Sequence, residues 1–300
     1  MEKTVAWLLE GDVSVQYMAC RDLIQADGTV LSRLRERIAS EGFGAAFLSR
    51  RNAGGHWGLH YYQPKWTCTH YTLLDLKNLC APQTLQPCRE MVMRMLGECM
   101  NEAGGVNLSK YDHPSDIGVD GMILNYASYF CGEDPRLGKL AGHLLSVQRA
   151  DGGFTWDAGA EAGEPHTTIC ALEGLAQYRK AGSPGGLRNV EAAQSKAESF
   201  LLSNQLFIGS GDRRFRMLSY PYRYRYDLMR VLEYFAAQGA PLYEEIQPAL
   251  CWLQGKRQKD GLWRLENIHK GNVHFSMEEV RSPSRFLTLK ALTVLRHFCN

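Results

Sequence analysis

A short glycine-rich turn recurs along the chain about every fifty residues, and no other feature constrains the fold as strongly. Each copy has one or two polar residues, then one or two glycines, then often an aromatic residue. The copies are "RNAGGHWG" (51–58), "NEAGGVN" (101–107), "RADGGF" (149–154) and "QKDGLW" (258–263). A repeat of this length indicates an array of equivalent structural units.

The segments that follow the turns differ in polarity from those that precede them. The following segments are apolar on more than one face, which is typical of buried helices. They span 13–24, 67–79, 119–130, 166–178, 222–235 and 284–298. The preceding segments have one apolar stripe and one charged face, which is typical of helices with a solvent side. They span 2–11, 30–40, 85–100, 134–148, 189–205 and 241–257.

These alternating segments predict an all-α protein, because strand-like alternation is nearly absent. An open helical array needs a polar capping helix at each end, yet the last segment is apolar almost to Cys299. Closing six hairpins into a ring would bury both ends. We therefore expect residues 1–300 to form one (α/α)6 toroid, with six inner helices inside six outer ones.

The turn "QRADGGF" is then expected to join an outer helix to an inner one. Gly152 and Gly153 would supply the positive φ of a tight turn, and Phe154 and Trp156 would pack the joint. A phosphate-binding loop is the alternative. It would require a preceding strand and a glycine pattern that the sequence does not contain.

Composition excludes several classes of function. The formal net charge is +2, from 34 basic and 32 acidic residues, so the overall charge gives no reason to expect nucleic acid as a partner. No segment approaches the roughly 20 apolar residues of a transmembrane helix, and "MEKTVAWLLEGD" lacks the features of a signal peptide. The nine cysteines are odd in number and contain no Cys-x-x-Cys. This predicts reduced thiols in a cytoplasmic protein.

The turns and the helices after them resemble a known superfamily. "SVQRADGGFTW", "LQGKRQKDGLW" and "RRNAGGHWG" resemble the Gln–Trp repeats of squalene and hopene cyclases and the repeats of protein prenyltransferase β subunits. "HTTICALEGLAQY", "PYRYRYDLMRVLEYF" and "SPSRFLTLKALTVL" are similar to bacterial single-toroid proteins described as squalene-cyclase-like. The resemblance covers essentially the whole chain and implies an α/α toroid. It implies little about the reaction.

The sequence departs from both well-known catalytic patterns of that superfamily. The Asp-x-Asp-Asp acid of the cyclases is absent, and the nearest string runs from Asp116 to Asp120. The Asp-x-Cys zinc pair of the prenyltransferases is also absent. His166 and Cys170 could place two metal ligands on one helix face, but a third is missing. A buried thiol near a polar pocket is the favoured interpretation, so no metal and no cofactor are expected.

A closed ring would bring the starts of all inner helices to one mouth, with partial positive charge from their dipoles. Candidate groups for general acid/base catalysis there are Asp116, Asp120, His166, Asp227 and Glu278. Candidate substrate-binding residues are His60, Trp66, Tyr222, Arg223, Tyr226, Trp263, Arg281 and Arg285. Asp112 also precedes the third inner helix. Several of these side chains have structural alternatives, since Asp116, Thr167 and Ser284 could be helix N-caps.

Three functions remain open. The first is an enzyme that acts on a small or isoprenoid-like substrate with an anionic group, bound in the barrel mouth. The second is a carbohydrate-active (α/α)6 enzyme with paired carboxylates. The third is a non-catalytic ligand-binding or scaffold protein. A deep aromatic-lined pocket would favour the first, an open polar cleft the second and a plugged barrel the third; the oligomeric state stays open.

The sequence also makes three geometric predictions. Asp227 should be buried beside a cation and ionised. His166, Tyr222, Arg223, Glu278 and Arg285 should line one shared cavity, with the long 264–284 loop as part of its wall. Arg285→Ala should then weaken an anionic ligand by about 1.5–3 kcal/mol without changing the fold.

Overall fold

The chain is described by a computed structural model that covers residues 2–109, 111, 113–182 and 187–299. Asp112 and residues 183–186 therefore lie outside the described residues. Within the described part the protein is all-α, with isolated β-bridges and no strand. None of its described helices has the length and apolarity needed to cross a membrane.

The expected buried segments and the expected outer segments all form helices. The buried set is α2 (Val13–Ala19, extended by a π-helical turn Cys20–Ile24), α5 (Thr69–Asn78), α7 (Ile117–Cys131), α9 (Pro165–Lys180), α11 (Leu228–Ala237) and α13 (Arg285–Cys299). The outer set is α1 (Glu2–Leu9), α3 (Gly28–Arg37), α4 (Gly42–Leu48), α6 (Gln86–Cys99), α8 (Arg136–Ser146), α10 (Leu187–Ser203) and α12 (Gln247–Gly255).

Burial separates the two sets as their polarity predicts. In α7 every residue from Gly118 to Ser128 is buried. In α8, by contrast, the buried residues form one stripe of Leu137, Leu140, Ala141 and Leu144. A stripe at this spacing covers one face of a helix and leaves the other in water.

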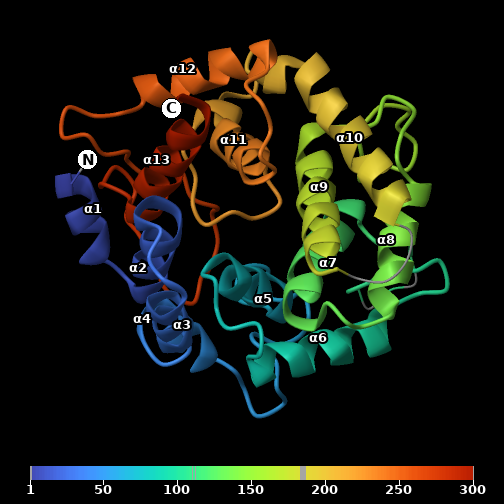
Figure 1. Cartoon of the computed structure of the whole chain (residues 1–300). Coiled ribbons are helices and arrows are strands. Elements are labelled where there is room, and N and C mark those ends of the chain that lie inside the picture. Colours follow the sequence, from blue (N-terminus) through green and yellow to red (C-terminus); the bar gives the residue numbers. More distant parts are fainter. Residues whose placement is uncertain (1, 110, 112, 183–186, 300) are drawn as a thin grey trace.

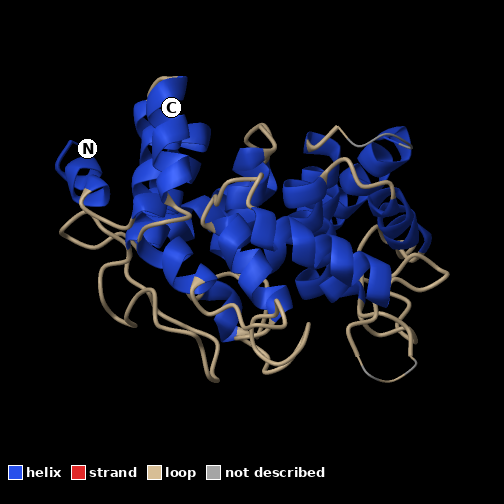
Figure 2. Cartoon of the chain, turned by 90° about the horizontal axis from the view of Figure 1, so that it is seen from below, coloured by secondary structure: helices blue, strands red, loops and turns tan. Residues whose placement is uncertain are grey.

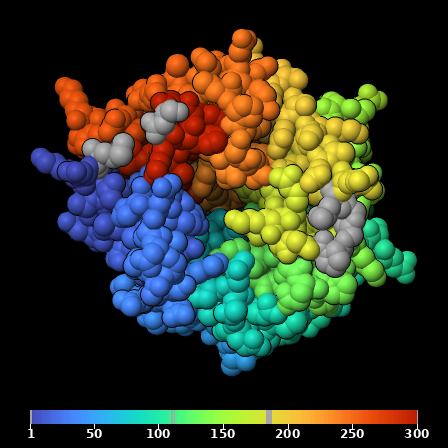
Figure 3. All heavy atoms as spheres, viewed as in Figure 1, coloured from blue at the N-terminus to red at the C-terminus, as the bar shows by residue number. Residues whose placement is uncertain are grey.

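The helices run round the molecule in chain order, and the last returns to the first (Figure 1). Helix α13 packs against α2. Arg285 Nε donates to the Trp7 carbonyl at 3.1 Å, and Arg296 Nη1 donates to the Leu23 carbonyl at 2.8 Å. In the space-filling view the blue N-terminal and red C-terminal segments meet on one face (Figure 3). The first and last hairpins are thus joined by direct contacts.

The closest pair of helices is α7 and α9, because glycines let their backbones approach. A Cβ added to Gly121 would lie 2.6 Å from the Ala171 nitrogen, and one added to Gly174 would lie 2.4 Å from the Gly121 carbonyl oxygen. No side chain fits between the helices at these points. The contact sets the N-terminal ends of α7 and α9 side by side.

The four glycine-rich turns share one backbone geometry. At the third, the Gly152 N–H donates to the Arg149 carbonyl and the Arg149 N–H donates to the Gly153 carbonyl, both at 2.9 Å. Gly152 has φ 89°, and the equivalent Gly55, Gly104 and Gly261 have φ between 82° and 91°. The expected positive φ is therefore confirmed at Gly152.

The same expectation is wrong for Gly153, because its backbone does not have a positive φ. Its lack of a side chain serves packing instead, since an added Cβ would lie 2.8 Å from the Gly163 Cα. Phe154 is fully buried and packs the joint as expected. Trp156 does not, because 67% of its surface is exposed.

A second repeated contact ties each turn to the inner helix that follows. Backbone N–H groups of Trp57, Phe154 and Trp263 donate to the hydroxyls of Thr69, Thr168 and Thr288, at 2.9–3.1 Å. In the remaining repeat Asp120 replaces the threonine and accepts the Val106 N–H at 2.8 Å. Asp120 therefore occupies a structural position of the repeat.

One added helix and two late helix starts differ from the prediction. Helix α12 begins at Gln247 rather than at 241, after a 3₁₀ turn at Glu244–Ile246. An additional helix, α4, stands between α3 and the first glycine-rich turn, and Gly42, with φ 60°, is its first residue. Helix α11 begins at Leu228 rather than 222, because Asp227 is its N-cap and accepts the Arg230 N–H at 2.9 Å. The segment "YRYRYD" is therefore a loop that leads into the helix.

Candidate functional site

The long loops that precede the inner helices gather on one face of the molecule (Figure 2). This face holds a cavity of about 300 Å³ at the adjoining starts of α7 and α9. Its wall includes Asp116 and His166 together with Tyr62, Trp156 and Tyr224. A neighbouring cavity of about 550 Å³ shares Tyr62, Asp116 and Val119 with it, and we call the two together the α7–α9 cleft.

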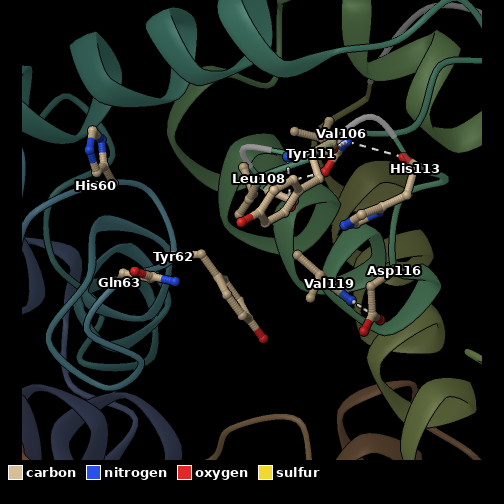
Figure 4. Close-up of a pocket in the computed structure, with 11 residues that line it drawn as sticks. His60, Tyr62, Gln63, Val106, Leu108, Tyr111, His113, Asp116 and Val119 are labelled. Carbon is tan, nitrogen blue, oxygen red and sulfur yellow. Dashed lines mark hydrogen bonds between the residues drawn. The ribbon is translucent and has the colours of Figure 1, made fainter.

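The larger cavity lies between two loops. Figure 4 shows His60, Tyr62 and Gln63 of one loop on one side, with Tyr111, His113 and Asp116 on the other. His60 and Tyr111 are both exposed. At the other end Asp116 and Trp156 are exposed as well, so both cavities of the cleft open to solvent.

Asp116 uses one carboxylate oxygen for structure and keeps the other free. Its Oδ1 accepts the N–H groups of Gly118 and Val119 at 2.9 and 3.1 Å, so it is the N-cap of α7. Its Oδ2 has no hydrogen-bond partner among the described residues, and the side chain is exposed. The expected capping role is confirmed, and a carboxylate oxygen remains available to a bound molecule.

His166 is held in one tautomer by a backbone contact. Its Nδ1 accepts the Tyr226 N–H at 2.8 Å, which places the proton of the neutral ring on Nε2. Burial lowers the pKa of His166 below its ordinary value. The ring is therefore neutral at pH 7, and its Nε2–H has no protein acceptor among the described residues.

Aromatic rings form the wall beside His166. Trp66 and Tyr224 stack with ring centroids 6.4 Å apart and an interplanar angle of 8°. The Lys65 ammonium lies 5.0 Å from the Trp66 ring and 4.8 Å from that of Tyr224. Tyr224, which is backed by Trp66, and the exposed Trp156 offer the cleft an apolar surface that has the Lys65 cation at its edge.

A separate cavity of about 190 Å³ lies under the 264–284 loop. Trp66, Arg223 and Glu278 contribute to its wall, so the loop does line a cavity as expected. Trp66 Nε1 donates to the Lys270 carbonyl at 2.6 Å and thereby fastens the loop. The stacked rings of Trp66 and Tyr224 stand between this cavity and the α7–α9 cleft.

The expectation of one shared cavity is therefore wrong. His166 lines the α7–α9 cleft, whereas Arg223 and Glu278 line the cavity under the loop. Tyr222 is buried between Arg230 and Lys290 and lines neither. Arg285 packs its guanidinium 4.5 Å from the centre of the Trp7 ring. A ring brings helix starts to one face, but the side chains between them decide which starts share a space.

Asp120 and Glu278 bind structural partners and do not share a site. Asp120 accepts the Val106 N–H and the Ser115 hydroxyl, the latter at 2.6 Å. Glu278 accepts the Ser284 hydroxyl and the N–H groups that begin α13. Burial raises the pKa of both carboxyls above their ordinary values.

Asp227 is buried as expected, with 3% of its surface exposed, but the expected ionisation is not found. Burial raises its pKa to about 7, against weaker opposing effects of the Arg230 N–H and the Arg230 charge. Asp227 has no ion pair within the described part of the chain, because the Arg230 guanidinium is bound to Glu173. The carboxyl is thus held largely by burial in a form that resists ionisation, with a pKa far above that of an exposed aspartate.

The other candidate binding residues are dispersed. Tyr226 is buried and donates its hydroxyl to the Leu206 carbonyl at 2.6 Å. Trp263 is buried and donates Nε1 to the Leu253 carbonyl at 2.8 Å, a contact of the repeated turn. Arg281 lies in a different cavity, described below. Among the candidates, only His60, Asp116 and His166 line the α7–α9 cleft.

The inner-helix N-termini are already neutralised by the protein's own carboxylates. Asp12, Asp116, Glu164 and Asp227 cap α2, α7, α9 and α11, and Glu278 reaches the first N–H groups of α13. Helix α5 begins after Cys68, which makes no side-chain cap bond. The expectation that these helix ends attract an anionic ligand group therefore lacks a basis, since a carboxyl group of the protein already accepts N–H groups at each capped end.

Sequence reasoning missed a set of ion pairs in which at least one partner lies on an inner helix. Asp75 pairs with Arg223, Glu173 with Arg230 at 2.7 Å, and Glu233 with Lys290 at 2.5 Å. Burial favours a raised pKa for Glu173, but the Arg230 charge outweighs it and lowers the pKa. A signal was present, because each apolar segment contains one or two isolated charges, as in "TLLDLKNL" and "ALEGLA". The tertiary structure brings these charges into contact with partners of opposite sign.

The thiols do not form a metal centre in the described part of the chain. No group of three potential ligands there is arranged to hold a metal ion. Burial raises the pKa of Cys170 to about 12, and its sulfur contacts the Arg230 guanidinium and the Tyr224 carbonyl. Such a thiol is protonated and is a poor ligand. The nine cysteines are free, without a disulfide among them.

Comparison with known proteins gives only distant structural likenesses. No family model and no curated protein matches the chain. Two structures of the type II terpene cyclase MstE from Scytonema align with 84% of this chain and 94% of theirs, at 13% and 14% identity and a TM-score of 0.33. One is the apo enzyme, and the other is a variant in complex with geranylgeranyl dihydroxybenzoate, its substrate. A TM-score this low assigns neither the fold nor a residue's role.

Proposed function

We propose that the chain is a single-domain (α/α)6 toroid that binds a small, largely apolar molecule in the α7–α9 cleft and transfers a proton on it. One observation carries the proposal: Asp116 and His166 come from the starts of two neighbouring inner helices and line the same aromatic cavity. The contacts between the first and last hairpins support the closed ring.

The two polar groups suit complementary roles. Asp116 Oδ2 would accept a proton from the substrate, because it is the oxygen left free by the capping contacts. His166 would donate its Nε2–H to a substrate oxygen, because the Tyr226 N–H occupies the other ring nitrogen. Tyr224 and Trp156 would hold the apolar part of the molecule.

An isoprenoid aldehyde combines the features that this arrangement would bind. Its chain suits the aromatic wall, its carbonyl oxygen suits the His166 donor, and its γ C–H is acidic enough for Asp116 to remove. An anionic group is not part of the proposed substrate. Most inner-helix N-termini are capped, and Lys65 is the one cation that lines the cavity of about 300 Å³ that holds Asp116 and His166.

Binding is tested with farnesal, a fifteen-carbon isoprenoid aldehyde, by calorimetric titration. Trp156→Ala removes a side chain that is 67% exposed at the cleft, and the matched control Tyr243→Ala removes one that is 39% exposed elsewhere. We expect Trp156→Ala to weaken farnesal about tenfold or more, and Tyr243→Ala to leave it unchanged. Equal affinities in both variants would place the ligand outside the cleft.

Proton transfer is tested by deuterium incorporation into farnesal in D₂O, followed by mass spectrometry. Asp116→Asn keeps an N-cap but removes the base, and we expect exchange to fall about a hundredfold or more. Asp27→Asn is the control, since Asp27 caps α3 through the same two contacts. Farnesal that binds at the cleft without protein-dependent exchange would refute the catalytic half of the proposal.

A non-catalytic binding or scaffold protein is the second candidate. The observation that favours it is the structural use of Asp120, Asp227 and Glu278, which leaves Asp116 as the sole candidate carboxylate in the cleft. Farnesal binding that responds to Trp156→Ala, with no exchange in any variant, would identify this function.

A further inference from the structure

A second concave site lies away from the α7–α9 cleft and is strongly cationic. It has a volume of about 870 Å³ and lies between the 213–217 segment, the end of α12 and both ends of the 264–284 loop. Five cationic side chains and one carboxylate line it. They are Arg213, Arg216, Lys256, Arg264, Arg281 and Glu266, and we call the site the basic groove.

The protein fixes three of these cations in place. Arg216 Nη1 donates to the carbonyls of Ile208 and Ser210, the latter at 3.0 Å. Lys256 Nζ donates to both oxygens of Glu266, at 2.7 and 2.8 Å, and Arg264 is paired with Asp260 at 2.9 Å. Cations held this way lose little freedom when a ligand binds.

Two further guanidinium groups are left uncommitted. The side chains of Arg213 and Arg281 are exposed and have no hydrogen-bond partner among the described residues. Like charges gathered in one concavity repel one another, and the carboxylates of Glu266 and Asp260 offset only Lys256 and Arg264. An anionic ligand would relieve this repulsion.

The backbone conformation of Arg281 is a separate indication that this side chain is positioned for a ligand. Arg281 has φ 72°, a left-handed conformation that is costly for a side chain of this kind. It is held there by its own N–H, which donates to the Leu265 carbonyl at 2.7 Å, and by the Ser282 N–H, which donates to the Glu279 carbonyl. Strained backbone of this type is concentrated where a side chain must be aimed at a ligand.

We propose that the basic groove is a binding site for a small polyanion with two or more phosphate groups. Planar guanidinium groups match phosphate oxygens in pairs, and the groove supplies four arginines from three separate segments. Aromatic side chains are absent from its lining, which suits a compact hydrophilic ligand better than an apolar one. The site is separate from the proposed catalytic cleft, with which it shares no residue.

The test is calorimetric titration of the full chain with inorganic tripolyphosphate at about 0.1 M ionic strength, where charges more than about 10 Å away are screened. The double variant Arg213→Gln, Arg281→Gln removes the two uncommitted guanidinium groups. Its charge-matched control is Arg33→Gln, Arg188→Gln, which removes two exposed arginines outside the groove. Melting temperatures without ligand verify that both variants are folded.

We expect the groove variant to bind tripolyphosphate at least about tenfold more weakly than the wild type, and the control variant to bind it unchanged. Equal weakening in both variants would show a general charge effect and overturn the site. A wild-type chain that takes up no tripolyphosphate would overturn it as well. Both results are independent of farnesal binding, so they leave the proposed function untouched.

Discussion

Replacement of Asp227 by asparagine should remove a large pH dependence of stability. Burial raises the pKa of this carboxyl to about 7, whereas an aspartate in the unfolded chain has a pKa of about 3.9. The folded chain therefore binds this proton more tightly than the unfolded chain does. The resulting stability is complete below pH of about 4, falls as the pH rises toward about 7 and is constant above that value.

The size of the effect follows from the two pKa values. Each pKa unit corresponds to about 1.4 kcal/mol, so the wild type should lose about 4 kcal/mol of unfolding free energy between pH 4 and pH 8 through this group. Asparagine carries no charge and can still accept the Arg230 N–H as the N-cap of α11. The variant should match the wild type near pH 4 and exceed its stability at pH 8.

The assay is urea unfolding of both proteins at a series of pH values from 4 to 8.5. The quantity that matters is the difference between the two unfolding free energies, because other titrating groups cancel in it. Asp27→Asn serves as the control, since Asp27 is an exposed N-cap whose pKa is lowered by the N–H groups of Val30 and Thr29. Parallel curves for wild type and Asp227→Asn would refute the raised pKa.

Two further predictions concern the ring and its turns. Arg223→Met should lower the unfolding free energy, measured by urea titration, by about 3–5 kcal/mol, because it leaves the buried Asp75 without its ion-pair partner. The double variant Arg223→Met, Asp75→Leu should recover most of this loss. Gly152→Ala should lower the melting temperature, because Gly152 has φ 89° and the new Cβ would lie 2.4 Å from the Lys196 carbonyl oxygen. Gly142→Ala should raise the melting temperature, because Gly142 lies inside α8 with open space around it and alanine favours the helix. Shifts of the same sign in the two glycine variants would contradict the turn geometry.

The sequence by itself determined the helices, their alternation and the joints between them. These features depend on local patterns: apolar residues all round α7 or on one stripe of α8, and a glycine such as Gly152 where the turn needs positive φ. The capping role of Asp116 could be predicted for the same reason, because an N-cap contacts N–H groups only two and three residues away. The extra helix α4 and the late starts of α11 and α12 were local features that it missed.

Only the tertiary structure decided which side chains share a space. Asp116 and His166 face one cavity because glycines bring α7 and α9 together, while the stacked rings of Trp66 and Tyr224 keep Arg223 in another. A single intervening side chain decides whether two residues far apart in the chain line the same cavity. No periodicity encodes that distance, because it depends on how all the helices pack at once.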